Sequence, residues 1–160
     1  MKTIKNDINL VLLLLILITV GISCINNKKR VERNYLSNAI KDLKFDDKIS
    51  WIVILPGLGC HGCIQQGEAF MKDYVDNNSV FFILTEVSSL KILQQKIGIN
   101  ISDYKNIFVD RENEFKVPTN NCIYPCILKI DNGKLTAFEF QCPDNGQAFA
   151  RLKNQIIANI

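Results

Sequence analysis

The pattern of hydrophobic and polar positions predicts helices and strands in alternation along most of the chain. Apolar residues recur three and four positions apart over residues 31–43, as in a helix with one buried face. A compact, β-branched run over residues 49–55 ends at Pro56-Gly57, which predicts a strand buried on both faces. A Cys-His-Gly-Cys segment follows, and a helical stripe then continues to Asn77-Asn78.

The second half of the chain repeats this alternation and closes with a hairpin. We expect strands over 80–85 and 106–110, a helix over 90–97 between Ser89 and Gly98, a polar helical turn over 111–115 and a loop over 117–124. Asn132-Gly133 is a strong hairpin signal between expected strands over 126–130 and 134–141, and a helix over 145–159 ends the chain. Strands that alternate with helices form parallel neighbours, and the late hairpin adds an antiparallel edge. The predicted fold class is therefore a three-layer α/β/α sandwich with a central mixed sheet.

The first residues carry the features of an export signal. Lys2 and Lys5 precede an apolar run, and Cys24 follows small residues at its end, so residues 1–23 resemble a bacterial lipoprotein signal peptide. Cys24 would be the lipidated first mature residue. The apolar run is marginal for a bilayer, which needs about 20 residues, so a plain signal peptide or an uncleaved anchor are the alternatives. In each case the domain lies outside the cytoplasm. We expect a lipid-anchored protein of the cell envelope whose domain faces the periplasm.

Composition supports one globular domain behind this signal. With 48% hydrophobic and 22% charged residues, the chain can bury a core and is not of the disordered class. The polar and basic residues 24–34 are expected to form a tether, and residues 35–160 to form the domain. The net charge of +3 is too small to indicate binding to nucleic acid. We expect a monomer.

The cysteines indicate redox chemistry. The chain has six; without Cys24 an odd number remains in a compartment where disulfides persist, so at least one thiol should stay unpaired or be paired only transiently. A redox enzyme tolerates such a thiol better than a disulfide scaffold does. The remaining cysteines are Cys60, Cys63, Cys122, Cys126 and Cys142.

Cys60 and Cys63 occupy the expected junction between a strand and a helix. Residues three apart lie one helical turn apart, close to the Cα separation of about 5 to 6 Å that a disulfide needs. Unpaired N–H groups and the helix dipole favour the thiolate of Cys60, which is therefore the predicted nucleophile, with Cys63 as the resolving thiol. His61 would add positive charge beside Cys60; alternatively, it is a solvated residue without influence.

These features resemble the thioredoxin superfamily over about residues 35–159. The resemblance rests on the strand at Trp51–Leu55, the turn into the CxxC motif, and Tyr124-Pro125 before the hairpin. Residues 108–135 are most similar to exported thioredoxin-like thiol reductases related to alkyl hydroperoxide reductase. The resemblance implies that Pro125 is cis and lies against the disulfide, and that Tyr124 lies beside the active site, so that both bind substrate.

Two departures from that family bear on the site. Many members have Trp directly before the first cysteine, where this chain has Gly59. Relatives also commonly bury an acidic residue beneath the second cysteine, but residues 49–55 contain none. Glu86, at the end of the next expected strand, is the candidate for proton transfer to Cys63.

The other cysteines leave several possibilities open. A structural disulfide that joins Cys122 to Cys126 or to Cys142 would pin the loop before the hairpin, and this is the preferred interpretation. Relay thiols for the active pair, or inert buried thiols, are the alternatives.

The expected function is thiol-disulfide exchange on cysteine-containing exported proteins, without a cofactor, and with a membrane or periplasmic redox donor. The main alternative is a lipoprotein in which Cys60, Cys63 and the Cys122/Cys126 pair hold zinc or copper. A third possibility is a structural lipoprotein whose CxxC segment forms only a stabilising bridge.

Overall fold

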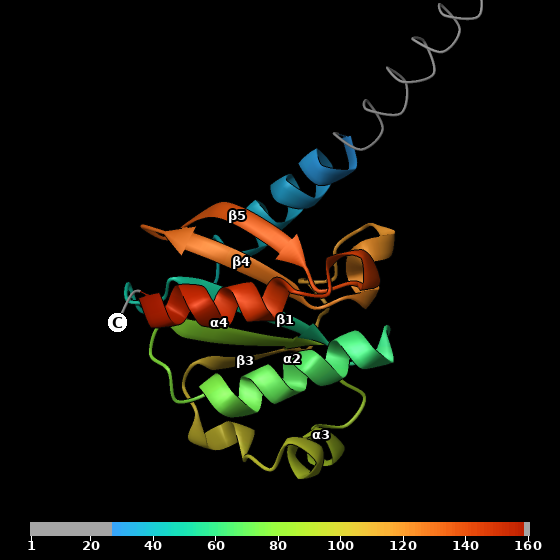
Figure 1. Cartoon of the computed structure of the whole chain (residues 1–160), viewed down its shortest axis with the longest axis vertical. Helices are drawn as coiled ribbons and strands as arrows, with labels where there is room; N and C mark the ends of the chain where they lie inside the picture. Colours follow the sequence, from blue (N-terminus) through green and yellow to red (C-terminus); the bar gives the residue numbers. More distant parts are fainter. Residues whose placement is uncertain (1–26, 159–160) are drawn as a thin grey trace, which may run out of the picture.

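The computed structural model describes residues 27–158, and it confirms the α/β class (Figure 1). Residues 27–39 are helical. The strands are β1 (Trp51–Pro56), β2 (Val80–Thr85), β3 (Ile107–Asp110), β4 (Cys126–Asp131) and β5 (Lys134–Phe140), and the later helices are α2 (His61–Tyr74), α3 (Leu90–Ile97) and α4 (Ala148–Ala158). Short 3₁₀ helices are η1 (Ile101–Asp103), η2 (Asn120–Ile123) and η3 (Pro143–Asn145).

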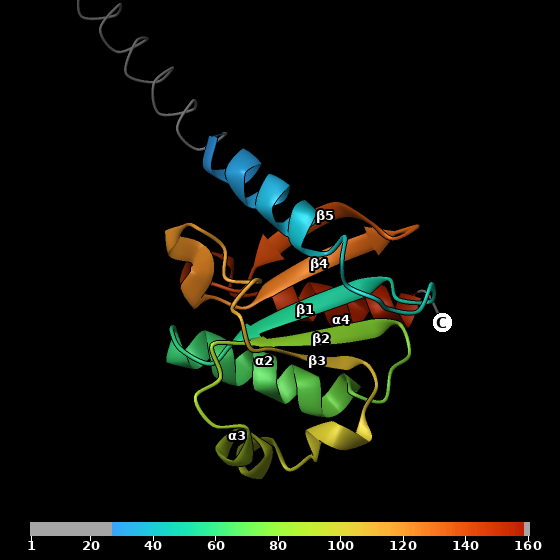
Figure 2. The same ribbon diagram turned by 180° about the vertical axis from the view of Figure 1, so that it is seen from behind.

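The five strands form one mixed sheet in the order β3-β2-β1-β4-β5. β1, β2 and β3 are parallel, whereas β4 is antiparallel to both β1 and β5. The helix at 27–39 covers one face and α2 and α4 cover the other, as the two opposite views show (Figures 1 and 2). This is a thioredoxin-like arrangement with a parallel core, as the sequence predicted.

Two apolar clusters, one on each face, hold the layers together. Every residue of β1 and β2 is buried, and alternate side chains therefore point into opposite clusters. Val53 and Phe82 pack with Phe70 of α2 and Phe149 of α4. Burial on both faces confirms the interpretation of the two continuous apolar runs as central strands.

The N-terminal helix lies earlier in the chain than its apolar spacing indicated. It covers 27–39 rather than 31–43, so residues 27–34 of the expected tether are helical within the described structure. Glu32 in that stretch is only 3% exposed. The expected signal peptide and Cys24 lie outside the described residues. Within residues 27–158, no helix is both long and apolar enough to span a bilayer.

Two further local predictions have different outcomes. The hairpin is confirmed, because Asp131 pairs with Lys134 across a two-residue turn in which Asn132 and Gly133 both have positive φ. The expected helical turn over 111–115 is wrong. The carboxylate of Asp110 accepts the N–H groups of Glu114 and Phe115 there, at 3.0 and 2.9 Å, so a side chain holds this bend in place of helical hydrogen bonds.

Candidate active site

Cys60 and Cys63 form a disulfide at the carboxyl end of β1, where the chain turns into α2. Cys60 is the N-cap residue of α2 and has extended backbone angles, and the two Cα atoms are 5.3 Å apart. The first turn of α2 contains no acidic residue. Because its N–H groups point toward Cys60 without an opposing carboxylate, the helix start favours a thiolate at this position once the disulfide is reduced.

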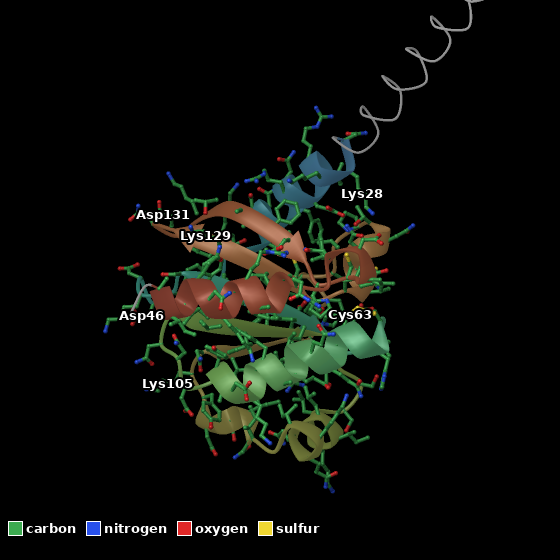
Figure 3. All side chains as sticks on the ribbon, in the orientation of Figure 1. Lys28, Asp46, Cys63, Lys105, Lys129 and Asp131 are labelled. Carbon is green, nitrogen blue, oxygen red and sulfur yellow. A yellow bond between two sulfur atoms is a disulfide. The ribbon has the colours of Figure 1, made fainter. Side chains whose placement is uncertain are left out.

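The two sulfur-bearing residues differ in their exposure. Cys60 is half-buried, whereas Cys63 is only 7% exposed and faces the interior, where Figure 3 labels it beside the start of α2. His61 and Gly62, between them, are both exposed. A partner can therefore approach Cys60 more readily than Cys63. His61 stands next to Cys60 in the first turn, and its effect on the thiolate stays a prediction.

The segment around η2 lies directly against the CxxC motif. The backbone N–H of Cys60 donates a hydrogen bond of 3.0 Å to the carbonyl oxygen of Ile123. Gly59 has a φ of 143°, and a Cβ atom there would lie 2.7 Å from the Cα of Ile123. Only glycine fits this close approach, which explains why the chain lacks the Trp found here in many thioredoxin-like proteins. No local pattern in the sequence pointed to Ile123.

Pro125 packs against α2 one turn after Cys63, and its peptide bond is not the cis bond that was expected. Pro125 is buried. Its Cγ lies 3.4 Å from the position that a Cβ atom would occupy at Gly67, which is one turn after Cys63 on α2. The described residues contain no cis peptide bond, so the Tyr124–Pro125 bond is trans, the intrinsically favoured form. Tyr124 is half-buried and extended, and its N–H closes the η2 turn on the carbonyl oxygen of Asn121 at 3.0 Å. The hydrogen bond between Tyr124 and Asn121 therefore forms while the Tyr124–Pro125 peptide bond is trans.

Gln141 is a site residue that the sequence interpretation missed. Its side chain is 1% exposed, and its backbone N–H donates to the carbonyl oxygen of Pro125 at 2.9 Å. The side-chain amide donates to Gln66 of α2 and to the Gly146 carbonyl, and its oxygen accepts the N–H of Phe149. Gln141 thus joins the Pro125 segment to α2 and to the start of α4. A single polar residue at a strand end carries no pattern that would reveal this role.

The candidate proton acceptor Glu86 is engaged elsewhere. Its carboxylate pairs with Lys116 at 2.6 Å, in a hollow that Leu58, Asp110 and Arg111 also line. This contact raises the pKa of Lys116 above its ordinary value, first through the hydrogen bond and then through the charge of Glu86. A second acidic residue, Glu68, is buried on α2 and pairs with Lys96 at 2.6 Å. Both carboxylates therefore already have a cationic partner.

The remaining cysteines do not form the expected structural disulfide. Cys122, Cys126 and Cys142 are free thiols in the structure. Cys126 is 2% exposed, and burial raises its pKa well above the ordinary value, with further contributions from the negative charges of Glu32 and Glu139. A buried, protonated thiol is a poor nucleophile, so Cys126 fits the alternative of an inert buried thiol.

The geometry gives no support to the metal-binding alternative. Over residues 27–158, no group of three or more His, Cys, Asp or Glu side chains is placed to hold a metal ion. Cys60 and Cys63 are bonded to each other, and they do not meet the Cys122/Cys126 pair in a four-sulfur cluster.

The fold and the disulfide together define the class of this protein. It is an α/β protein with a thioredoxin-like sheet and a CxxC disulfide at the start of α2, an arrangement that suggests a redox function. The sequence matches no model of a known protein family and no curated protein.

Proposed function

We propose that this protein is a thiol-disulfide oxidoreductase that acts on cysteine-containing exported proteins. The observation that carries the proposal is the unequal exposure of two bonded cysteines at a helix start, with Cys60 accessible and Cys63 buried. The helix start favours the thiolate form of the accessible sulfur. The buried sulfur is kept within bonding distance of it but away from partners.

In the reductive direction, the thiolate of Cys60 attacks one sulfur of a substrate disulfide. An S–S bond forms between Cys60 and the substrate, and the second substrate sulfur leaves as a thiolate that takes up a proton. The thiolate of Cys63 then attacks the sulfur of Cys60 and releases the reduced substrate. Two electrons pass to the substrate, the Cys60–Cys63 disulfide forms, and a thiol donor reduces it again; the oxidative direction reverses these steps.

Pro125 and Tyr124 are proposed to contact the substrate on one side of the disulfide. Pro125 packs against α2 at Gly67, one turn after Cys63, and the backbone N–H of Gln141 holds the Pro125 carbonyl group in place. A substrate chain that is bonded to Cys60 would therefore pass over a supported segment.

We further propose that the domain works in the cell envelope, tethered through a lipid on Cys24. The support is the lipoprotein-like signal at residues 1–23, which ends at Cys24. The redox donor would then be a membrane or periplasmic protein. Labelling with a radioactive fatty acid in cells tests the anchor, and Cys24→Ala should abolish incorporation.

Trapping of mixed disulfides tests the central proposal. In a Cys63→Ala variant the second step is blocked, so partner proteins should accumulate on Cys60 in complexes that dithiothreitol releases. The matched control is Cys60→Ala, which should trap none. Absence of complexes in the first variant, together with a wild-type disulfide that exchanges with no small thiol, would refute the assignment.

A further inference from the structure

Three exposed apolar side chains lie on segments that adjoin the CxxC motif. Within residues 27–158, the large hydrophobic residues with substantial exposure are Val31, Leu58, Ile92, Phe108, Ile123 and Ile157. Leu58 is two residues before Cys60 and 58% exposed, and Ile123 accepts the Cys60 N–H through its carbonyl oxygen. Ile92 is 66% exposed and lines a cavity that also contacts Ile64, the neighbour of Cys63. The other three lie elsewhere on the surface. Exposed apolar side chains on the segments around a reactive site indicate an interaction surface.

The cavity lies between α2 and α3, at the carboxyl ends of β1 and β2. Its volume is about 190 Å³ and its lining is mainly apolar, formed by Leu55, Ile64, Leu84, Val87, Ile92 and Leu93. Its charged lining residues, Glu68 and Lys96, form an ion pair of 2.6 Å and so neutralise each other. The cavity therefore favours an uncharged, apolar occupant.

The position and size of the cavity indicate what that occupant is. Cofactor and drug-sized ligands occupy about 300 to 1,000 Å³, whereas a cavity of about 150 Å³ holds a molecule as small as benzene. A volume of about 190 Å³ thus suits one bulky side chain. Its α2 lining residues, Ile64 and Glu68, belong to the first two turns of that helix. In Figure 1, α3 and the segment before β4 lie on opposite sides of the α2 start.

We propose that this cavity, the α2/α3 pocket, binds a bulky apolar side chain close to the reacting cysteine of the substrate polypeptide. The inference rests on the proposed function and names its substrate class: polypeptides with an apolar residue near the disulfide, rather than small hydrophilic disulfides. The substrate chain crosses Cys60 from the Pro125 side, passes Leu58 and places one side chain between α2 and α3. The pocket contributes to substrate binding and leaves the exchange chemistry to Cys60 and Cys63.

Kinetics with synthetic peptides test this inference on the reduced full-length chain in mild detergent. Each peptide carries one cysteine as a mixed disulfide with thionitrobenzoate, in a serine and glycine background. A single leucine is moved one residue at a time along both sides of the cysteine. Attack by Cys60 forms the Cys60–peptide disulfide and releases thionitrobenzoate, whose absorbance gives the rate. At one leucine position the rate should exceed that of the serine peptide about tenfold, as expected for burial of part of a leucine side chain.

Ile92→Asp places a charge in the pocket and should remove this leucine preference. Ile157→Asp is the matched control, because Ile157 is 63% exposed on α4 and does not line the pocket, and it should keep the preference. Ile92→Ala, a milder change, should weaken the preference without adding a charge, and thermal unfolding confirms that each variant is folded.

The same reagents separate failure of this inference from failure of the proposed function. The difference between wild type and Cys60→Ala in the reaction with free dithiobis(nitrobenzoate) gives the basal reactivity of Cys60, because Cys122 and Cys142 are also free thiols. If that reaction is retained but leucine has no effect, or if Ile92→Asp keeps the preference, the pocket inference is overturned. A dimer that Ile92→Asp converts to a monomer, without any leucine preference, would assign the pocket to a second copy and would also overturn it. An inert wild-type protein would overturn the proposed function as well.

Discussion

The backbone N–H of Cys60 is bonded to the carbonyl oxygen of Ile123 at 3.0 Å, so the reactive turn and the η2 segment form one unit. The hydroxyl of Thr119, the N-cap residue of η2, donates to the buried carboxylate of Glu32 at 2.5 Å. Asn121 donates to the same carboxylate oxygen at 2.9 Å. The geometry at Cys60 therefore depends on a helix that precedes the sheet.

Gly59→Ala should destabilise the protein by about 2 kcal/mol or more, because the new Cβ meets the Ile123 backbone and the φ of 143° is strained for alanine. Chemical denaturation of the reduced protein measures this loss. Gly62→Ala is the matched control in the same turn: nothing lies within 4 Å of its Cβ position, and alanine favours a helix. Equal effects of the two substitutions would contradict the close contact between Gly59 and Ile123.

Glu32→Ala should lower the free energy of unfolding by about 1 to 3 kcal/mol, because Thr119 and Asn121 both lose their acceptor. Glu32→Gln keeps one oxygen acceptor and should cost less. Urea unfolding provides the comparison. Asn34→Ala, at an exposed position on the same helix, should change stability little. If Asn34→Ala lowers the free energy of unfolding as much as Glu32→Ala does, the hydrogen bonds of Glu32 make no specific contribution to stability.

Thr85→Val should stabilise the protein by about 1 kcal/mol. Thr85 is 2% exposed, and its hydroxyl is the buried side-chain group within the described structure that has no hydrogen-bond partner. Valine has nearly the same shape and removes the cost of burying that hydroxyl. Thermal unfolding measures the change. At Thr136 the hydroxyl donates to the Lys129 carbonyl oxygen on the surface, so Thr136→Val should not stabilise, and a gain there but not at Thr85 would disprove this reasoning.

The raised pKa of Cys126 predicts a loss of stability at alkaline pH. Below the ordinary thiol pKa of 9.0, the thiol is protonated in both the folded and the unfolded chain. Above it, the unfolded chain releases the proton while the folded chain retains it, so stability falls by up to about 1.4 kcal/mol per pH unit. Unfolding of the reduced protein across this range should show a shallower decline for Cys126→Ala. Cys142→Ala serves as the control, and the same decline in wild type and Cys126→Ala would contradict the assignment to Cys126.

Local patterns were sufficient to predict several parts of this protein. The runs over 49–55 and 80–85 predicted the two central strands, because a strand buried on both faces needs apolar residues at successive positions. Asn132-Gly133 predicted the hairpin, since both residues tolerate positive φ. The spacing of Cys60 and Cys63 after a strand predicted a disulfide at the start of a helix. Each of these depends on residues that are close together in the chain.

Tertiary structure decided the features that depend on contacts between distant segments. The packing of Ile123 against Gly59, the network around Gln141 and the burial of Glu32 each join parts of the chain that sequence periodicity treats separately. Cys122, Cys126 and Cys142 are free thiols where a structural disulfide was expected, and the Tyr124–Pro125 bond is trans where a cis bond was expected. Local sequence determines which residues form strands, turns and helices. Which surfaces then meet is decided by the packing of the whole chain, and that packing places the α2/α3 pocket against the first turns of α2, the helix that begins at the CxxC motif.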